Sequence, residues 1–532
     1  MADGQSPLEL GDFGLYSDEF DTAADGITIT RSDLLKASAA AVAALSLPGA
    51  ARASGWAPTQ PKPKRGGALR VAVRRGAAQT NLDPNSAPIV GVVSRSVYDQ
   101  LAKLVNGKLE LRLAESIEPN RDGTRWRVRL NRGVTFHNGK TLTADDVLFT
   151  FGRVLNKTLP SAHRTFFTDV FRYRKLDRYT VEFRLRRPDF FFVEALTRPY
   201  IVPVGTTDYS RPIGTGPWVF KSLVPDQVSD YARNPNYWLE GRPYANSLQI
   251  YVIDNAEARY NALVSRQVDA IASVTLARAN SIIANSNFEL HRSRSDNIKP
   301  FTMRVDKPPF TDRRVREAMK LIVDRNQIVR NGVTGVGRVA NDLFGATQEY
   351  YLSDLPQRKQ DIERARSLLR QAGQEDLRVK LSTTSADADL LSSATLFAEQ
   401  AKKAGVTVQI ENLPTGYYGS RYLQYDFGQT GWNSQSIILW WLSALVPTAP
   451  YNETHWPGGA DAKQIDLARA TRSEKTRREI LNAVQRRQWT NGGYIIWGTL
   501  DLVDARSAKL KGLVRDSGFA LGDLDFRNAW FV

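Results

Sequence analysis

The 532-residue chain contains no cysteine, and this absence removes several kinds of site at once. Disulfides, thiolate metal sites, cysteine nucleophiles and iron–sulfur clusters all need thiol groups. Because the lipid anchor of a bacterial lipoprotein is attached to an N-terminal cysteine, we expect a protein that is not a lipoprotein. The lack of cysteine is compatible with an oxidising compartment but does not demonstrate one.

Histidine and methionine are scarce as well, with four and three residues. The histidines (137, 163, 291 and 455) stand far apart and none has metal-ligand spacing. His137 lies beside a predicted hairpin, where a structural role is more common than that of a ligand or base. The chain also lacks the H-E-x-x-H, G-x-S-x-G and P-loop motifs. We therefore expect no metal, no cofactor and no enzymatic activity.

Acidic residues are too few to balance the basic ones, and the formal net charge is +16. Residues 1–53 hold eight acidic and three basic side chains, so the remainder carries 69 basic and 48 acidic ones. Such a charge favours contact with anionic surfaces, for example membranes or wall polymers. Nucleic acid is a sharper interpretation, but the basic residues are scattered and form no tail beyond Lys62–Arg65. We expect no nucleic-acid partner.

Long apolar runs are missing except near the N-terminus, where residues 34–47 are almost entirely apolar. This run is too short for a membrane span of about 20 residues. Ala51–Ala53 fits a small-x-small cleavage site, which would make Ser54 the first mature residue. We interpret residues 1–53 as an export signal and residues 54–67 as a Pro-rich linker.

The export route and the fate of the signal stay open. Residues 30–36 resemble a twin-arginine signal, but Ser32 stands where the second arginine belongs. The acidic stretch 1–26 is also atypical of a signal. An uncleaved helix that anchors the protein at the membrane is the alternative to cleavage, although the sequence favours cleavage. Both alternatives place the protein in the periplasm or at the outer face of the cytoplasmic membrane.

Strand and helix patterns alternate along the rest of the chain, which indicates an α/β protein. Segments with strand-like runs or alternating apolar residues are Leu69–Val73, Trp126–Leu130, Val181–Leu185 and Leu248–Val252. Predicted helix starts are Thr143–Asp146, Asp254–Glu257, Asp312 and Asp361. The last of these helices is expected to end at Gly373, in the left-handed conformation.

Six stretches rich in turn-forming and helix-starting residues follow one another in the chain. They are Asn81–Pro84; Leu113–Ser116 with Pro119–Gly123, Gly133–Gly139 and Leu142–Val147; Pro212–Trp218; Arg233–Trp238 with Gly241–Pro243; Ala262–Leu263 with Val268–Asp269; and Pro308–Asp312 with Arg314–Ala318 and Asp324–Arg325. In order and spacing these stretches resemble the oligopeptide/dipeptide/nickel family of ABC-transporter extracellular solute-binding proteins (family 5). The resemblance covers residues 68–375.

The resemblance implies a two-lobed, periplasmic-binding-protein-like α/β fold with mixed sheets and an extra inserted domain. Lobe I would be discontinuous, the inserted domain II would follow its first part, and lobe II (domain III) would close on the solute. The expected ranges are 68–98, 210–298 and 490–532 for lobe I, 99–209 for domain II and 299–489 for lobe II.

The resemblance also indicates where a solute would bind. Peptide-binding members carry Gly-Trp-x-x-Asp-Tyr-x-Asp-Pro near residues 431–440, and the first aspartate binds the amino terminus of the peptide. Here Gly431 and Trp432 remain, but Asn433, Ser434 and Gln435 follow and both acids are gone. This change argues against free peptides and leaves capped peptides, glycans or another neutral or anionic solute.

Aromatic side chains crowd the same region and could form the walls of a solute pocket. The alternative is that most of them pack in the core or between domains. Arg421 fits either a ligand carboxylate or an ordinary surface position, and the surface position is favoured. The candidate ligand-binding residues are Trp432, Asn433, Ser434, Gln435, Trp440, Trp441, Tyr417, Arg421, Ser86 and Ala87.

Together these observations predict a receptor, usually monomeric in this family, that delivers a small solute to the permease subunits of an ABC importer. A second hypothesis is a solute sensor or peptide chaperone on the same fold, without a role in import. Neighbouring permease and ATPase genes would favour the first hypothesis, and an isolated gene beside a sensor kinase the second. A hydrolase would need a nucleophile–base pair that the sequence does not offer.

Overall fold

The computed structural model describes residues 62–74, 82–86 and 91–532, apart from residues 162, 334–335 and 386. All of them belong to one compact unit, residues 57–532. The predicted export signal, its cleavage site, most of the linker and Ala87 lie outside the described residues. Within the described ranges, no helix is long and apolar enough to cross a membrane.

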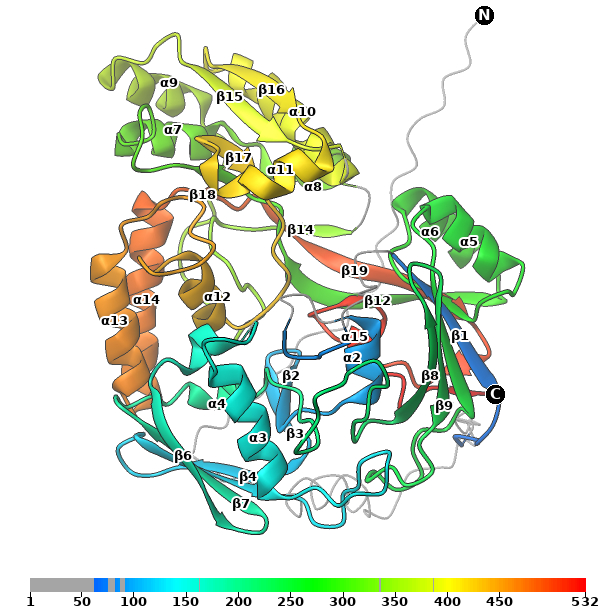
Figure 1. The fold of residues 1–532 in the computed structure, drawn as a ribbon. Coiled ribbons are helices and arrows are strands. Elements are labelled where there is room, and N and C mark those ends of the chain that lie inside the picture. Colours follow the sequence, from blue (N-terminus) through cyan, green and yellow to red (C-terminus); the bar gives the residue numbers. More distant parts are fainter. Residues whose placement is uncertain (1–61, 75–81, 87–90, 162, 334–335, 386) are drawn as a thin grey trace, which may run out of the picture. The chain divides into compact units, whose positions relative to one another are not determined.

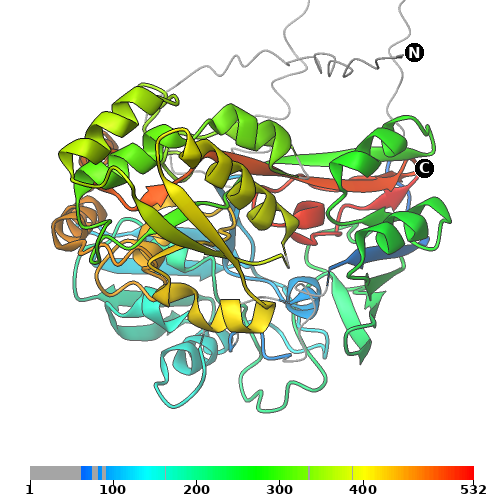
Figure 2. The same ribbon diagram turned by 90° about the horizontal axis from the view of Figure 1, so that it is seen from above.

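The largest sheet has eight strands and combines segments from distant parts of the chain. Seven strands follow the order β12 (Phe288–Asn297), β19 (Gly498–Ser507), β11 (Ala270–Ile271), β1 (Ala68–Val73), β10 (Ser247–Val252), β9 (Val228–Arg233) and β8 (Trp218–Val224), and β14 (Gly337–Val339) also pairs with β19. Strand β1 runs parallel to both of its neighbours. Figure 2 shows β19, in red, beside β12, in green. The sheet is therefore completed only by strand β19, which comes late in the chain.

A second sheet has four antiparallel strands in the order β4 (Ala114–Pro119), β5 (Arg125–Leu130), β7 (Thr180–Leu185) and β6 (Val170–Asp177). Helix α3 (Ala144–Leu155) covers one face, as Figure 1 shows. The inward residues of β5 are Trp126, Val128 and Leu130, and they are buried, while the arginines between them are exposed. The alternating sequence thus produces a sheet with one apolar face and one charged face.

The third sheet has five strands in the order β16 (Thr407–Asn412), β15 (Arg378–Thr383), β17 (Phe427–Gln429), β13 (Phe301–Met303) and β18 (Tyr494–Ile495). Its helices are α7 (Arg313–Ile322), α8 (Arg325–Asn331), α9 (Ile362–Gln371) and α10 (Ala388–Lys402). Phe301, Phe397 and Phe427 pack together in its core.

The remaining elements are short or lie beside these sheets. They are α2 (Val92–Val97), β2 (Ala102–Val105), β3 (Lys108–Leu111), η2 (Arg164–Phe167), α4 (Phe192–Ala195), α5 (Ala256–Val264), α6 (Leu276–Ile283), α11 (Thr415–Arg421), η3 (Tyr422–Gln424), α12 (Ile437–Ala444), α13 (Gly459–Ala470), α14 (Glu474–Asn491), β20 (Leu510–Lys511), α15 (Ala520–Asp523) and β21 (Trp530–Phe531).

Two short connections link the eight-stranded and five-stranded sheets at one place. The chain passes from the end of β12 at Asn297 to the start of β13 at Phe301, and it returns from the end of β18 at Ile495 to the start of β19 at Gly498. Because β12 pairs with β19 and β13 pairs with β18, the two connections lie close together. Such a pair of short crossings is the usual form of a hinge between lobes.

Most predicted local structure is confirmed. The four predicted strands are β1, β5, β7 and β10, Thr143 and Asp146 form a capping box, and Asp312 and Asp361 cap their helices. Gly373 has a φ of +66°. The predicted cap at Asp254 is wrong, because Asn255 accepts the hydrogen bond from the Ala258 N–H and begins α5.

The motif Pro212–Trp218 has a packing role. A Cβ atom added at Gly214 or Gly216 would lie 2.1 Å or 2.6 Å from the carbonyl oxygen of Val97, so only glycine allows this close approach. His137 contacts the same segment, since its Nε2 lies 3.0 Å from the Gly216 carbonyl oxygen. Burial lowers the pKa of His137, which suits a neutral structural histidine.

Candidate functional site

Residues 431–436 lie directly beside the hinge. Trp432 and Ile298 exchange two backbone hydrogen bonds of 2.9 Å, one in each direction. The Ser434 N–H donates to Asn297 Oδ1 over 2.8 Å. The segment that the resemblance selects is thus held by the residues that connect the two largest sheets.

Two further loops contact this segment. Gln348 Nε2 donates to Ser434 Oγ over 3.4 Å and to the buried Asp296 carboxylate over 3.1 Å. Gly518 lies on the other side, where an added Cβ atom would stand 3.9 Å from the Ser434 carbonyl oxygen. The segment is therefore in contact with three separate regions of the chain, around residues 297, 348 and 518.

A fourth contact comes from residues 194–198, which follow the four-stranded sheet. Ser436 caps α12 by accepting from the Leu439 N–H, and its hydroxyl donates to Glu194 Oε2. Arg198 Nη2 donates to Gln435 Oε1 over 3.2 Å. These side chains are separated by 242 and 237 residues in the sequence. Only the fold brings these two side chains, one acidic and one basic, to the segment.

The environment shifts the pKa of both charged side chains toward neutrality. Burial raises the pKa of Glu194 to about 7, against the stabilising hydrogen bond from Ser436. Burial also lowers the pKa of Arg198 to about 10, although Glu194 partly opposes this shift. Both side chains nevertheless keep some accessible surface. Side chains that are both desolvated and accessible are typical of the wall of a binding site.

Arg198 has little compensation for its charge. Its guanidinium carbon lies 3.9 Å from the centre of the Phe166 ring, and its Nε atom has no hydrogen-bond partner among the described residues. Among these residues, no carboxylate forms an ion pair with Arg198. His163 is buried nearby, and neither of its ring nitrogens has a described partner. Burial and the charge of Arg198 lower the pKa of His163 to about 3, so it is neutral.

Trp432 is half-buried and forms part of an aromatic group. Its indole N–H donates to Glu453 Oε1 over 2.8 Å, and its ring meets Tyr451 and Trp440 edge to face. Burial raises the pKa of Glu453 to about 7. Asn433, next in the chain, is exposed.

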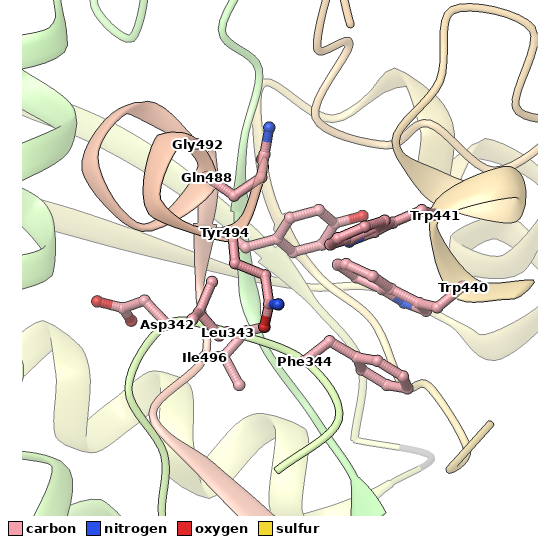
Figure 3. Close-up of a pocket in the computed structure, with 10 residues that line it drawn as sticks. Asp342, Leu343, Phe344, Trp440, Trp441, Gln488, Gly492, Tyr494 and Ile496 are labelled. Atoms are coloured by element: carbon pink, nitrogen blue, oxygen red, sulfur yellow. The ribbon is translucent and has the colours of Figure 1, made fainter. Parts of the chain in front are cut away.

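Trp440 and Trp441 lie in the core beside this segment. Trp440 stacks on Phe344 with ring centres 4.6 Å apart, and both indoles are almost fully buried. Figure 3 shows them with Tyr494 around a cavity of about 20 Å³, which has room for about one water molecule. In this conformation their surroundings are those of packing residues, and contact with a solute stays a prediction.

Tyr417 and Arg421 lie on α11 and line a different, open hollow of about 570 Å³. Both are exposed, the Tyr417 hydroxyl accepts from Arg421 Nη1, and the guanidinium lies 5.0 Å from the tyrosine ring centre. Arg421 thus lies at the surface beside this hollow, and its contact with a solute stays a prediction. The structure does not place these two residues in the group formed by Trp432, Glu194 and Arg198.

Ser86 lies in the turn after β1, where its hydroxyl donates to the Asp83 carbonyl oxygen over 3.2 Å. The neighbouring Asn85 exchanges two hydrogen bonds of 2.9 Å with the Tyr200 backbone, two residues after Arg198. This turn therefore helps to position the 194–198 segment. Ala87, its predicted partner in the site, lies outside the described residues.

Sequence reasoning missed Glu194 and Arg198, and no signal in the sequence could have identified them, because their partners are more than 200 residues away. The described residues contain no cluster of three histidine, aspartate or glutamate side chains that could hold a metal ion. The site offers hydrogen-bond donors, one arginine, two acids of raised pKa (Glu194 and Glu453) and an aromatic wall. Such a set can bind a small polar solute.

Comparison with known proteins identifies relatives of this chain. Residues 108–446 match the model of bacterial extracellular solute-binding proteins, family 5. Di/tripeptide-binding protein 1 of Pseudomonas aeruginosa is 26% identical over 74% of this chain and 81% of its own length. Heme-binding protein A of Haemophilus influenzae is 28% identical, but the match spans 53% of this chain and only 57% of that relative.

Solved structures show the fold. The periplasmic binding protein DppA from Helicobacter pylori, in complex with a peptide, has a TM-score of 0.75 and 22% identity over 88% of this chain and 98% of its own. This likeness confirms the predicted two-lobed α/β fold. The family match covers well over half of the residues. The chain therefore belongs to the bacterial extracellular solute-binding proteins of family 5, and the predicted function, a solute receptor that serves an ABC importer, is confirmed.

Proposed function

We propose that this receptor binds a small solute with a carboxylate or similar anionic group, between residues 432–436 and the segment that carries Glu194 and Arg198. Arg198 would bind the anion, and Trp432 would form a wall. Asn433, Ser434 and Gln435 would supply hydrogen bonds. This solute falls within the neutral or anionic class that remains when the two family aspartates are missing.

The observation that carries the proposal is the charge of Arg198, which Glu194 offsets only in part and which forms no ion pair among the described residues. A desolvated guanidinium without a carboxylate partner is unfavourable, because it has lost water and gained little in exchange. A planar anionic group on a solute would restore two parallel hydrogen bonds. Peptides end in such a group, and the Pseudomonas aeruginosa relative is a peptide-binding protein by name.

Glu194 supports a second candidate, a solute with a free amino group. Sequence reasoning found no acid in segment 433–436, but Glu194 reaches Ser436 from another part of the chain. Its raised pKa leaves it partly protonated near neutral pH in the absence of a solute. An ammonium group beside it would favour the ionised form and release a proton on binding.

The sheets support the proposed division into lobe I, the inserted domain II and lobe II, with two adjustments. Strand β18 (Tyr494–Ile495) pairs with β13, so lobe II would extend beyond residue 489. Strand β14 falls within range 299–489 but pairs with β19. Domain II and lobe II are joined by Arg469, whose Nη2 lies 2.7 Å from Asp189 and whose carbonyl oxygen accepts from the Phe190 N–H over 2.8 Å. This contact would accompany closure.

The receptor would act as an exported monomer at the outer face of the cytoplasmic membrane, where it would meet the permease subunits of the importer. The absence of cysteine agrees with a protein that is not a lipoprotein. A solute sensor would use the same site, so binding alone does not separate the two roles. Uptake of the bound solute by cells with and without this receptor would separate them.

Thermal melting of the chain that begins at Ser54, against free peptides, capped peptides, glycans and small carboxylic acids, tests the proposal. A ligand present at about 1,000 times its Kd stabilises the native state by about 4 kcal/mol. We expect shifts with solutes that carry a carboxylate and none with their amides. Equal shifts with acid and amide would overturn the role of Arg198, and shifts only with glycans would overturn the solute class.

A further inference from the structure

One face of the four-stranded sheet is occupied by arginine side chains. Arg125, Arg184 and Arg172 lie opposite one another on β5, β7 and β6, and Arg127 and Arg174 flank Glu182 in the next row. We call the outward arginines of this sheet the arginine face: Arg125, Arg127, Arg129, Arg172, Arg174 and Arg184. Helix α3 packs on the opposite face (Figure 1), where the inward side chains form a buried core. The arginine face therefore lies on the side of the sheet away from this core.

The acids on this face do not balance the arginines. Glu182 alone receives three of them, with N–O distances of 3.9 Å from Arg127, 3.1 Å from Arg174 and 2.9 Å from Arg184. The other three arginines of the face form no ion pair within the described residues. Two further outward acids lie on this sheet. Glu118 lies opposite Arg127 on β4, and Asp177 on β6 lies opposite Thr180, whose other neighbour is Arg129. Six guanidinium groups therefore share three carboxylates.

This arrangement is unfavourable for the fold alone. Like charges directly opposite each other on neighbouring strands destabilise a sheet, and ordinary surfaces mix the two signs. Every basic side chain in the outward rows of this sheet is an arginine, whereas Lys175 on β6 pairs with the inward Val181. Arginine differs from lysine in its planar, bidentate recognition of phosphate groups. The composition and the register together indicate a surface that binds phosphate-bearing groups.

Two exposed apolar side chains on the edge strand β6 narrow the choice of partner. Phe171 is 54% exposed and Leu176 is 38% exposed, and the Arg186 guanidinium lies 6.0 Å from the Phe171 ring centre. Basic residues beside exposed apolar ones are typical of proteins that bind at the membrane interface, where the apolar group enters the headgroup region.

We propose that the arginine face binds the surface of an anionic phospholipid membrane. The arginines would contact lipid phosphates, and Phe171 and Leu176 would contact the headgroup–acyl boundary. This surface is separate from the solute site and would hold the receptor near the membrane that contains its importer. The proposal does not depend on which solute is bound.

Sedimentation with lipid vesicles tests the proposal. The chain that begins at Ser54 keeps the whole compact unit and lacks the apolar run 34–47, which could itself bind lipid. We expect it to bind vesicles of phosphatidylcholine and phosphatidylglycerol in equal parts, to bind pure phosphatidylcholine far more weakly, and to dissociate as salt screens the charges. No preference for the anionic vesicles would overturn the proposal.

Matched triple variants separate the arginine face from net charge. Each arginine near an anionic surface contributes about fivefold in affinity, so Arg125→Gln/Arg129→Gln/Arg172→Gln should weaken binding on the order of a hundredfold. The control Arg313→Gln/Arg364→Gln/Arg370→Gln removes three exposed arginines from α7 and α9 and should change binding by less than about fivefold. Equal losses in both variants would overturn the proposal, provided that both melt like the parent.

Phe171→Ser distinguishes a membrane from a soluble polyanion. Loss of the apolar contact should weaken vesicle binding severalfold and leave binding to soluble polyphosphate unchanged. If polyphosphate binds as tightly as the vesicles and Phe171→Ser affects neither, the arginine face binds soluble polyanions and the lipid proposal is wrong.

Discussion

Two groups of charged residues in this protein are built in opposite ways. Around α15, Asp525 accepts from Arg527 Nε over 2.5 Å, and Asp523 pairs with Arg95 at 2.7 Å and Lys103 at 2.9 Å. The second group contacts residues 435 and 436. There Arg198 has no ion-pair partner among the described residues, and the pKa of Glu194 is about 7. The first group is compensated within the protein, whereas the second is the group that we propose binds the solute. The contrast is between charges that stabilise the fold and charges with a proposed role in binding.

The largest expected effect comes from removing a charge in the compensated group. Burial raises the pKa of Asp525, but Arg527, Lys103 and Arg112 outweigh it and hold the pKa well below its ordinary value. Asp525→Asn leaves these cations without their anion and should lower the free energy of unfolding in urea by about 3–5 kcal/mol. Asp354→Asn, which breaks an exposed pair with Arg486, should change it by less than about 1 kcal/mol. Similar values for both would remove the contrast.

Glu453, which accepts from the Trp432 indole in the candidate site, tests how pH affects the free energy of unfolding. Its pKa rises from 4.5 to about 7 in the folded state, so the folded protein binds more protons than the unfolded chain between these pH values. The contribution of Glu453 to stability is therefore present below pH 4.5 and is lost as the pH rises through 7. Glu453→Gln should gain about 3 kcal/mol relative to the parent between pH 4.5 and pH 8. A difference that does not change with pH would contradict the shifted pKa.

Arg198→Gln should affect binding and leave folding nearly unchanged. A hydrogen bond to a charged group contributes about 1.5–3 kcal/mol, so the Kd for a carboxylate solute should rise roughly 10- to 150-fold in calorimetry. The Kd for the corresponding amide should change little. Arg370→Gln, an exposed arginine on α9, serves as the control. Equal losses of affinity for the acid and the amide would show that Arg198 does not bind the carboxylate.

The smallest effect on stability is expected for Glu194→Gln. Because the carboxyl is partly protonated at neutral pH, an amide can take its place and still accept from Ser436, and the free energy of unfolding should change by less than about 1 kcal/mol. The variant should also abolish any rise in affinity for ammonium-bearing solutes between pH 6 and pH 8. Retention of that rise would assign the titration to another group.

The parts of the fold that local chemistry determines were predictable. Thr143, Asp312 and Asp361 begin helices because their side chains accept backbone N–H groups. The failure at Asp254 is of the same kind, since Asp254 and Asn255 offer similar caps and only the backbone decides between them.

Of the proposed solute site, the sequence could indicate only the part that lies on one continuous segment. Trp432 could be located from its motif, but Glu194 and Arg198 could not, because tertiary structure alone brings them to residues 435–436. The aromatic run in α12 has no polar face, which is typical of a buried helix. That pattern, read more strictly, would have favoured packing for Trp440 and Trp441.

Strand β19 has a consequence for the time at which this protein can fold. It lies between β12 and β11, so the largest sheet cannot close until residues 498–507 have left the ribosome. Domains usually fold as units during synthesis, starting from the N-terminus. Here strand β1, made first, must wait for more than 400 residues before the sheet around it is complete. For the exported receptor that we propose, the unfinished lobe would leave an interval in which the export machinery meets a chain that has not yet folded.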